Sequence, residues 1–183
     1  RRGEPFDHLT FAGSGEPTLS LDLGEIVAQA KEIVDSPVAV ITNSTLLSNP
    51  AVRKEVAAAD VVLPSLDAAS QAAFLAVNRP ASGLYAKDMI QGLKDFRKEF
   101  SGEIWLEVML VRGINDQEAE LIARAAESTQ PDRIQLNTVV RPPAEPVQAL
   151  SEEEMQRMLE IFPGAELIPD WDWSVPARIR DKL

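Results

Sequence analysis

Short apolar runs alternate with longer amphipathic stretches along most of this chain. The runs predict five strands, over residues 8–12, 38–42, 61–66, 103–111 and 133–140. The stretches between them carry apolar residues at helical spacing and predict helices over residues 23–35, 50–59, 84–100 and 115–128. Another helix is predicted from Ser151 to a stop at Pro163-Gly164, and residues 68–83 are predicted to be irregular or partly helical.

Capping residues mark the expected start of several of these helices. Asn49 precedes Pro50, a combination that favours the first turn of a helix. Three pairs have the spacing of capping residues: Asp22 and Glu25, Asn115 and Glu118, and Ser151 and Glu154. We therefore expect side chains to cap the start of each of these helices.

The order of the elements predicts an α/β fold with a parallel sheet. No strong hairpin signal joins two strands, so each strand must reach the next through a crossover. A closed barrel and an open doubly wound sheet both fit this alternation. The full glycine fingerprint G-x-G-x-x-G is absent, which makes a dinucleotide-binding version of this fold a weaker prediction.

The length of 183 residues and the 45% apolar content predict one domain over residues 1–183. Residues 165–183 are expected to form a C-terminal tail. That tail is predicted either to add a short strand near Leu167 or to cover an open sheet edge with Trp171 and Trp173.

Composition narrows the partners and the location. The formal net charge of −11 repels phosphate backbones, so a nucleic-acid partner would need a local basic patch. The run Arg178, Arg180 and Lys182 is interrupted by Asp181 and is interpreted as a solvated tail. No apolar run approaches the roughly 20 residues that span a bilayer, and no signal peptide is visible. We expect a cytoplasmic protein with no membrane partner; its first residue is not Met, which leaves room for an earlier start.

The stretch Gly13-Ser14-Gly15-Glu16-Pro17-Thr18 lies between the first predicted strand and the first helix. Its small residues leave main-chain N–H groups uncovered, so a ligand can approach the backbone closely. Glu16 places a negative charge beside those donors, and the combination suits a zwitterion such as the amino-acid end of a metabolite. The alternative is a plain strand-to-helix turn in which Pro17 ends the strand.

Polar residues also follow or lie within the other predicted strands. Ligands of parallel α/β folds bind at the carboxyl ends of the strands, so we expect these side chains to converge. The candidate binding residues are Gly13, Ser14, Gly15, Glu16, Asn43, Ser65, Asp67, Glu107, Gln135 and Asn137. For Glu107 an ion pair with a neighbouring Arg or Lys is an equal alternative, and Glu16 with Asp67 could form an acid–base pair.

Several of these segments resemble motifs of the radical S-adenosylmethionine enzymes. Residues 13–19 are similar to the Gly-Gly-Glu-Pro segment of that family. Further segments follow in the family's order: Thr42-Asn43-Ser44, Pro64-Ser65-Leu66-Asp67-Ala68, Asn78-Arg79-Pro80, Val111-Arg112-Gly113-Ile114-Asn115-Asp116, Leu136-Asn137-Thr138 and Arg141-Pro142-Pro143. The set covers roughly residues 8–145 and most resembles the branch that includes the wyosine-base (tRNA) synthases.

The resemblance implies a partial (β/α)6 parallel barrel that binds S-adenosylmethionine beside a 4Fe-4S cluster. In that family the reduced cluster cleaves the sulfonium, and the resulting 5′-deoxyadenosyl radical abstracts hydrogen from a substrate. By position, Gly15 and Glu16 would hold the methionine amino group, while Asn43, Ser65 and Asp67 would line the ribose and carboxylate. Glu107, Gln135 and Asn137 would complete the pocket.

Two departures from the family pattern matter. The family's Cys-x3-Cys-x2-Cys loop and the strand before it have no counterpart, and Ser14 replaces the first glycine of Gly-Gly-Glu. We therefore expect a fragment that lacks the first strand and the cluster loop and is inactive alone. The alternatives are a nucleotide-binding barrel without a cluster, and a metal-dependent (β/α) lyase or aldolase that uses Glu16, Asp67 and Glu107.

The resemblance also implies partners. An electron donor such as flavodoxin or ferredoxin would reduce the cluster. The 18 basic residues against 29 acidic ones favour a peptide, protein or small-molecule substrate, with tRNA as the alternative. A missing first strand would leave a sheet edge unpaired, through which the fragment could form a dimer.

A polypeptide of these 183 residues is predicted to assemble no iron–sulfur cluster, because cysteine thiolates are the usual ligands and the sequence contains none. Anaerobic reconstitution with iron and sulfide, followed by visible absorption spectroscopy, should show no cluster chromophore. A stoichiometric cluster on this polypeptide would contradict the prediction.

Overall fold

The computed structural model describes residues 6–13, 15–140, 143 and 145–168. Its strands are β1 (Leu9–Phe11), β2 (Val38–Thr42), β3 (Val61–Pro64), β4 (Glu103–Arg112), β5 (Arg133–Thr138), β6 (Gln148–Ala149) and β7 (Glu166–Leu167). Its helices are α1 (Leu23–Ile33), α2 (Pro50–Val56), α3 (Gln71–Val77), α4 (Ala86–Glu99), α5 (Ala119–Ser128) and α6 (Glu152–Ile161), with 3-10 turns η1 (Pro17–Leu19) and η2 (Asp116–Glu118). The five predicted strands are confirmed, and so is the short strand near Leu167.

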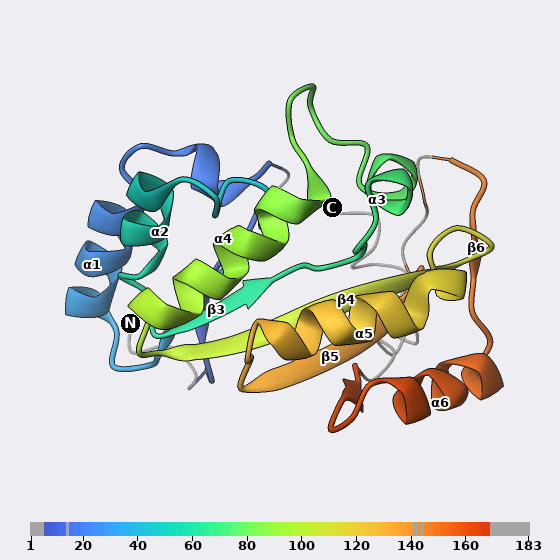
Figure 1. The fold of residues 1–183 in the computed structure, drawn as a ribbon. Coiled ribbons are helices and arrows are strands. Elements are labelled where there is room, and N and C mark those ends of the chain that lie inside the picture. The colour runs from blue at the N-terminus through green and yellow to red at the C-terminus, as the bar shows by residue number, and fades with distance from the viewer. Residues whose placement is uncertain (1–5, 14, 141–142, 144, 169–183) are drawn as a thin grey trace.

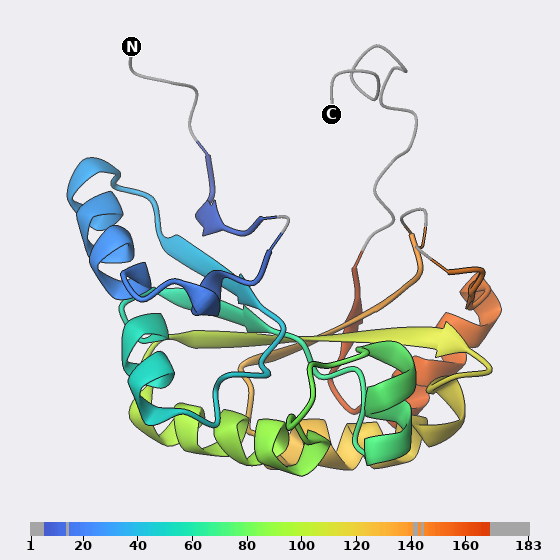
Figure 2. The same ribbon diagram turned by 90° about the horizontal axis from the view of Figure 1, so that it is seen from above.

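The described strands form one sheet in the order β1-β2-β3-β4-β5-β7, and each neighbouring pair on this path is parallel. β6 lies off the path and pairs antiparallel with β4. Figure 1 shows the helices arranged along this sheet, and Figure 2 shows α4 and α5 side by side beneath it while β1 and β7 rise at its two ends. The predicted parallel α/β fold is therefore confirmed.

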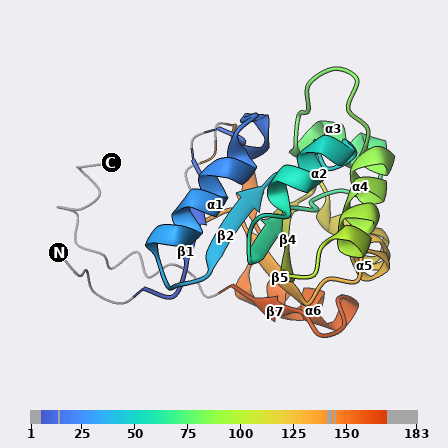
Figure 3. The ribbon, with the colours of Figure 1, turned by 90° about the vertical axis from the view of Figure 1, so that its left-hand side faces the viewer.

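Alternation along the strands separates an outer, helix-covered face from an inner face. On β4 the outer side chains are completely buried and belong to the core: Ile104, Leu106, Val108 and Leu110. Successive side chains of a strand point to opposite faces, so Trp105, Glu107 and Met109 lie on the inner face. Figure 3 shows α1, α2, α4 and α5 following one another around the outside of the sheet.

Two of the predicted helix caps are confirmed and two are wrong. Asn49 accepts a hydrogen bond from the Ala51 N–H, and Ser151 with Glu154 forms a complete capping box. Asp22 makes no side-chain cap; Glu55 of α2 instead accepts a hydrogen bond from the Gly24 N–H in the first turn of α1. The Asn115 side chain does not cap a helix either, because it is engaged elsewhere, as described below. The predictions for Ser14, Arg141, Pro142, Trp171, Trp173, Arg178, Arg180 and Lys182 lie outside the described residues.

A buried arginine joins the segment after β2 to α2 and α4. Arg53 is only 7% exposed, and its guanidinium donates to both carboxylate oxygens of Glu99 at 2.8 and 2.9 Å. The same guanidinium donates to the main-chain carbonyls of Leu47 and Ser48. Such a bidentate pair is geometrically specific, so it fixes the 47–48 segment against α4.

The first stability prediction concerns Gly92 of α4, where that segment crosses the helix. A Cβ at Gly92 would lie 2.5 Å from the Leu47 carbonyl carbon and the Ser48 nitrogen. Alanine normally stabilises a helix by about 1 kcal/mol over glycine, but forcing backbone apart costs about 1–3 kcal/mol. Gly92→Ala is therefore expected to lower the free energy of unfolding, measured by urea denaturation.

Gly15→Ala provides the control for Gly92→Ala. A Cβ at Gly15 would meet none of the described residues within 4 Å, and Gly15 is not among the glycines with a positive φ in that part of the chain. Its free energy of unfolding should stay within about 0.5 kcal/mol of the parent. A stabilised Gly92→Ala protein would show that the 47–48 segment moves away at no cost.

Candidate functional site

Glu16 ties the loop after β1 to the end of β2. Its Oε1 accepts hydrogen bonds from the Thr18 N–H, the Thr18 hydroxyl and the Thr42 hydroxyl, at 3.1, 2.7 and 2.6 Å. Its Oε2 accepts one bond, from the Asn43 N–H at 2.7 Å. The carboxylate is therefore held in one orientation at the carboxyl ends of two neighbouring strands.

The glycine loop itself is open. Gly13 and Gly15 are exposed, and neither has a positive φ. A Cβ built on Gly15 would meet no atom within 4 Å, so the space next to its backbone is free of the described residues. Asn43 is also exposed, and its side-chain oxygen accepts from the N–H and hydroxyl of Thr45.

The parallel register brings three of the predicted residues into one row. Ser65 follows β3 and forms a bridge with Glu107, which is paired with Gln135 of β5. Glu107 lies in the middle of β4, but β3 is so short that it ends at the same level. Asn137 lies one step further along β5, beside Met109. Gln135 donates to Glu166 of β7, whereas the Asn137 Oδ1 is buried without a hydrogen-bond partner in the described structure.

Asp67 lies inside the protein, below this row. Its carboxylate accepts a hydrogen bond from the Met109 N–H on Oδ1 and one from the Asn78 amide on Oδ2, both at 2.9 Å. The side chain is 7% exposed, and burial raises the pKa of Asp67 above its ordinary value, although both hydrogen bonds work in the opposite direction. In this position Asp67 contacts β4 rather than open space.

Asn115 completes the same network. Its Oδ1 accepts from the Val111 N–H at 2.7 Å, and its amide donates to the main-chain carbonyls of Asp67 and Met109 at 2.7 and 2.8 Å. The side chain is completely buried. A buried amide that satisfies three main-chain groups holds the end of β4 against the segment after β3.

The sequence pattern does not predict the hydrogen bonds that three residues make in this region: Thr42, Asn78 and Asn115. The sequence indicates Thr42 only as the end of a strand and as part of the segment Thr42-Asn43-Ser44; in the structure its hydroxyl donates to Glu16 and it is 1% exposed. A polar residue that ends an apolar strand was the available signal for Thr42. Asn78 and Asn115 find their partners 11 and 48 residues away, and spacing along the chain carries no signal of that.

The predicted carboxylates do not form a metal site. Across residues 6–13, 15–140, 143 and 145–168, no group of three or more His, Cys, Asp or Glu side chains could hold a metal ion. Glu16 is bonded at the end of β2, and Asp67 is bonded to β4. The alternative of a metal-dependent lyase built on Glu16, Asp67 and Glu107 is therefore not supported by their geometry.

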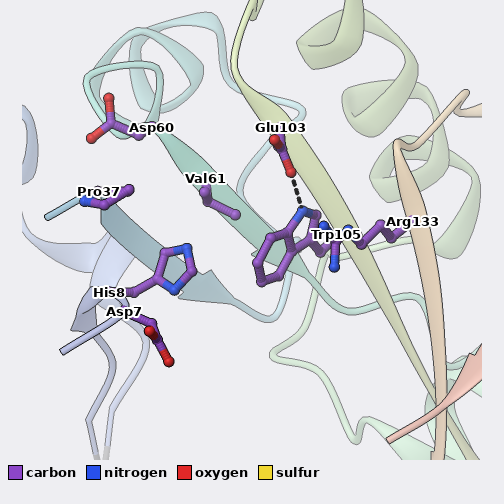
Figure 4. Close-up of a pocket in the computed structure, with 8 residues that line it drawn as sticks. All are labelled: Asp7, His8, Pro37, Asp60, Val61, Glu103, Trp105 and Arg133. Carbon is purple, nitrogen blue, oxygen red and sulfur yellow. Dashed lines mark hydrogen bonds between the residues drawn. The ribbon is translucent and has the colours of Figure 1, made fainter.

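A hollow lies at the opposite, amino ends of the strands. Figure 4 shows its lining residues: Asp7, His8, Pro37, Asp60, Val61, Glu103, Trp105 and Arg133. The rings of His8 and Trp105 meet edge to face at 5.3 Å, and the Arg133 guanidinium lies 4.5 Å from the centre of the Trp105 ring. The indole N–H donates to Glu103, so its polar groups are satisfied within the protein. We interpret this cluster as a structural contact across the inner face.

Comparisons with known proteins identify the family of this chain. A sequence model of the Radical SAM superfamily matches residues 3–126. A protein described as GTPase Obg from Brachyspira hyodysenteriae is 42% identical over 159 residues, which cover 85% of this chain and 23% of that protein. A UPF0026 protein from Methanocaldococcus jannaschii is 32% identical over 162 residues, which cover 87% of this chain and 50% of that protein. The chain thus spans half or less of the length of these relatives.

A solved structure has the same fold. The crystal structure of a domain of pyruvate-formate lyase-activating enzyme from Bacteroides vulgatus matches with a TM-score of 0.69 at 21% identity, covering 87% of this chain and 98% of that one. At this identity the likeness shows the fold alone. It confirms the predicted fold class.

No helix in the described part of the chain is both long and apolar enough to cross a membrane.

The second stability prediction concerns Asp67, which burial holds nearer to its neutral form. Because its native pKa is raised, its contribution to stability is complete below the ordinary value of 3.8 and is lost as the pH rises through the native pKa. Asp67→Asn keeps the acceptor for the Met109 N–H. After a flip of the Asn78 amide, the new amide group would also donate to the Asn78 Oδ1, which has no hydrogen-bond partner among the described residues of the parent. We expect this variant to be at least as stable as the parent at pH 7 and to lose that pH dependence.

Asp67→Ala is the comparison for Asp67→Asn. It leaves the Met109 N–H unsatisfied and should cost about 1–3 kcal/mol of unfolding free energy, with the larger cost at the lower pH, where the parent keeps more of the contribution of Asp67. Chemical denaturation at pH 4 and pH 8 measures both variants. If Asp67→Asn lost as much stability at pH 8 as Asp67→Ala, the negative charge itself would be stabilising and the interpretation would be wrong.

Proposed function

This chain belongs to the radical SAM superfamily, and from that membership we propose that the loops at its carboxyl ends bind S-adenosylmethionine. In this family the bound cofactor supplies a 5′-deoxyadenosyl radical that removes hydrogen from a substrate. The thiolates that would hold a 4Fe-4S cluster are not among these 183 residues, so we assign no step to the cluster. In this proposal the residues of this chain bind S-adenosylmethionine and orient it.

The fixed carboxylate of Glu16 is the observation that carries the proposal. A carboxylate offers about four acceptor sites, and here Oε1 receives three hydrogen bonds while Oε2 receives one. Oε2 therefore has capacity for the ammonium of the methionine moiety. The space beside Gly15 is free of the described residues, which would leave room for the cofactor next to this loop.

Residues on the inner face would hold the rest of the cofactor. Ser65 and Glu107 lie next to each other in the row described above, and Asn137 follows beside Met109. The Asn137 Oδ1 is buried without a partner among the described residues, which is costly, and a donor on the adenine would satisfy it. Asp67 would act on the site indirectly, by fixing the Met109 backbone.

Three finer assignments extend this proposal. The wyosine-base synthase branch rests on the order of the motifs, from residues 13–19 through 136–138. The cluster loop and first strand would come from the part of the longer relatives that this chain does not span. The acidic composition favours a peptide, protein or small-molecule substrate over tRNA, and an electron donor such as flavodoxin or ferredoxin would reduce the cluster.

A nucleotide-binding barrel without radical chemistry is the second candidate. It is favoured by one observation, the absence of cysteine from the sequence. Both candidates require the same pocket for the adenosyl group. A gene that encodes a three-cysteine loop upstream of this sequence would support the radical enzyme.

The binding prediction uses Glu16→Gln and two ligands. Replacing Oε2 by an amide group removes the acceptor for the ammonium, and a charge-assisted hydrogen bond is worth about 1.5–3 kcal/mol. Isothermal titration calorimetry should therefore show S-adenosylmethionine binding weakened about 10- to 100-fold. Binding of 5′-methylthioadenosine, which lacks the amino-acid moiety, should change little.

Glu25→Gln is the matched control for Glu16→Gln. Glu25 is an exposed residue of α1 that contacts only Gln29 among the described hydrogen bonds, and its substitution should leave both affinities unchanged. Equal weakening of both ligands by Glu16→Gln would mean that the loop is merely disordered. No effect on either ligand would remove Glu16 from the site.

A further inference from the structure

Arg79 holds a backbone conformation that arginine normally avoids. Its φ is +45°, in the left-handed region, directly after the C-cap of α3 at Asn78. Glycine is the usual residue at this position of a helix end, because it has no Cβ to clash. The following residue, Pro80, further restricts the backbone of Arg79.

The contacts of the Arg79 side chain do not account for this strain. The guanidinium donates to the Glu145 carboxylate at 2.8 Å, and the two side chains are 58% and 63% exposed. An exposed ion pair returns little stability, less than a left-handed non-glycine residue costs. A glycine at position 79 is therefore expected to give a more stable protein, and stability does not explain the arginine side chain.

The anchor of this loop is the buried network of the candidate site. The Asn78 amide donates to the Asp67 carboxylate, which in turn accepts from the Met109 N–H. These bonds fix the residue directly before Arg79 to β4. The strained conformation is therefore held by the same groups that shape the inner face.

The Arg79–Glu145 pair spans the carboxyl end of the sheet. Arg79 belongs to the segment after β3 and α3, whereas Glu145 belongs to the segment after β5. Because β4 lies between β3 and β5 in the sheet, the pair connects segments that follow the two neighbours of β4. It lies at the same end of the sheet as the row of Ser65, Glu107 and Asn137.

The charges of the side chains at this end of the sheet indicate a role for Arg79. The predicted binding residues include the carboxyl groups of Glu16 and Glu107, which repel an anion when they are charged. Arg112, another cation here, already gives its guanidinium to Glu154 and to the Ala149 carbonyl. An anionic group on a ligand therefore needs a positive charge, and Arg79 carries one on a weakly held side chain.

We propose that Arg79 is a specificity residue that exchanges Glu145 for a carboxylate or phosphate group of the molecule bound at the carboxyl ends. This inference rests on the proposed function for the identity of that site. Glu145 holds the guanidinium in place until the anion displaces it. The anion comes either from the methionyl carboxylate of S-adenosylmethionine or from an acidic group of the substrate.

The experiment compares Arg79→Gln, Arg79→Gly and Glu145→Gln with the parent chain. Calorimetry with inorganic pyrophosphate as the probe is expected to show binding weakened about tenfold or more in both Arg79 variants. Glu145→Gln removes the competing carboxylate and should tighten pyrophosphate binding. Arg79→Gly should also raise the thermal midpoint by a few degrees, because it relieves the left-handed strain.

Two adenosyl ligands identify the source of the anion. If Arg79→Gln weakens S-adenosylmethionine but not 5′-methylthioadenosine, the anion is the methionyl carboxylate. If it weakens pyrophosphate and leaves both adenosyl ligands unchanged, the anion belongs to the substrate. Arg124→Gln is the control, since Arg124 is 65% exposed and pairs with Glu120 on α5; it should change none of these affinities.

Unchanged pyrophosphate and S-adenosylmethionine binding in both Arg79 variants would overturn the inference. So would a lower thermal midpoint of Arg79→Gly, because the arginine would then be explained by stability. If the parent chain binds neither adenosyl ligand, the proposed function fails. The pyrophosphate and thermal measurements still decide the role of Arg79 in that case.

Discussion

Side-chain hydrogen bonds hold β3 and β4 together beyond the end of their ladder, and the carboxyl end of the sheet depends on them. The paired positions are Val61 with Glu103 and Val62 with Ile104, followed by the single bridge at Ser65. Beyond that bridge, Asp67 and Asn115 supply the bonds that a regular ladder would make with main-chain groups. Side chains can satisfy a backbone while it diverges, which leaves room for polar residues between the strands.

The fold was predictable because its signals are local and repeated. Strands buried on an outer face alternate in hydrophobicity, and helices between them rule out hairpins, so the parallel order follows from the pattern. Helix starts were predictable only where a cap has no competing partner. Ser151 caps α6, whereas Asn115 follows the same spacing rule and bonds instead to groups that lie near it only in the folded chain.

The candidate site was predictable in part, and the limits are physical. The rule that ligands bind at carboxyl ends placed Ser65 and Glu107 together, but their alignment depends on β3 being shorter than β4. No signal in the sequence predicts that Asp67 is more deeply buried than Ser65, which lies two positions earlier. In the structure Asp67 is buried against β4, where it accepts from the Met109 N–H, while Ser65 stays half-buried. A charged residue at the end of a strand thus indicates where the site lies, and the burial of its side chain decides whether it can contact a ligand.

The contact between His8 and Trp105 joins β4 to the residue directly before β1, a strand that is not its neighbour in the sheet. β1 has three residues and pairs only with β2 in the described part, and so short an edge strand opens locally at little cost in free energy. The ring contact couples that opening to β4, whose outer face lies in the core. Because the Glu16 loop continues directly from β1, its position depends on this contact with β4 as well as on its own hydrogen bonds to Thr42 and Asn43 at the end of β2.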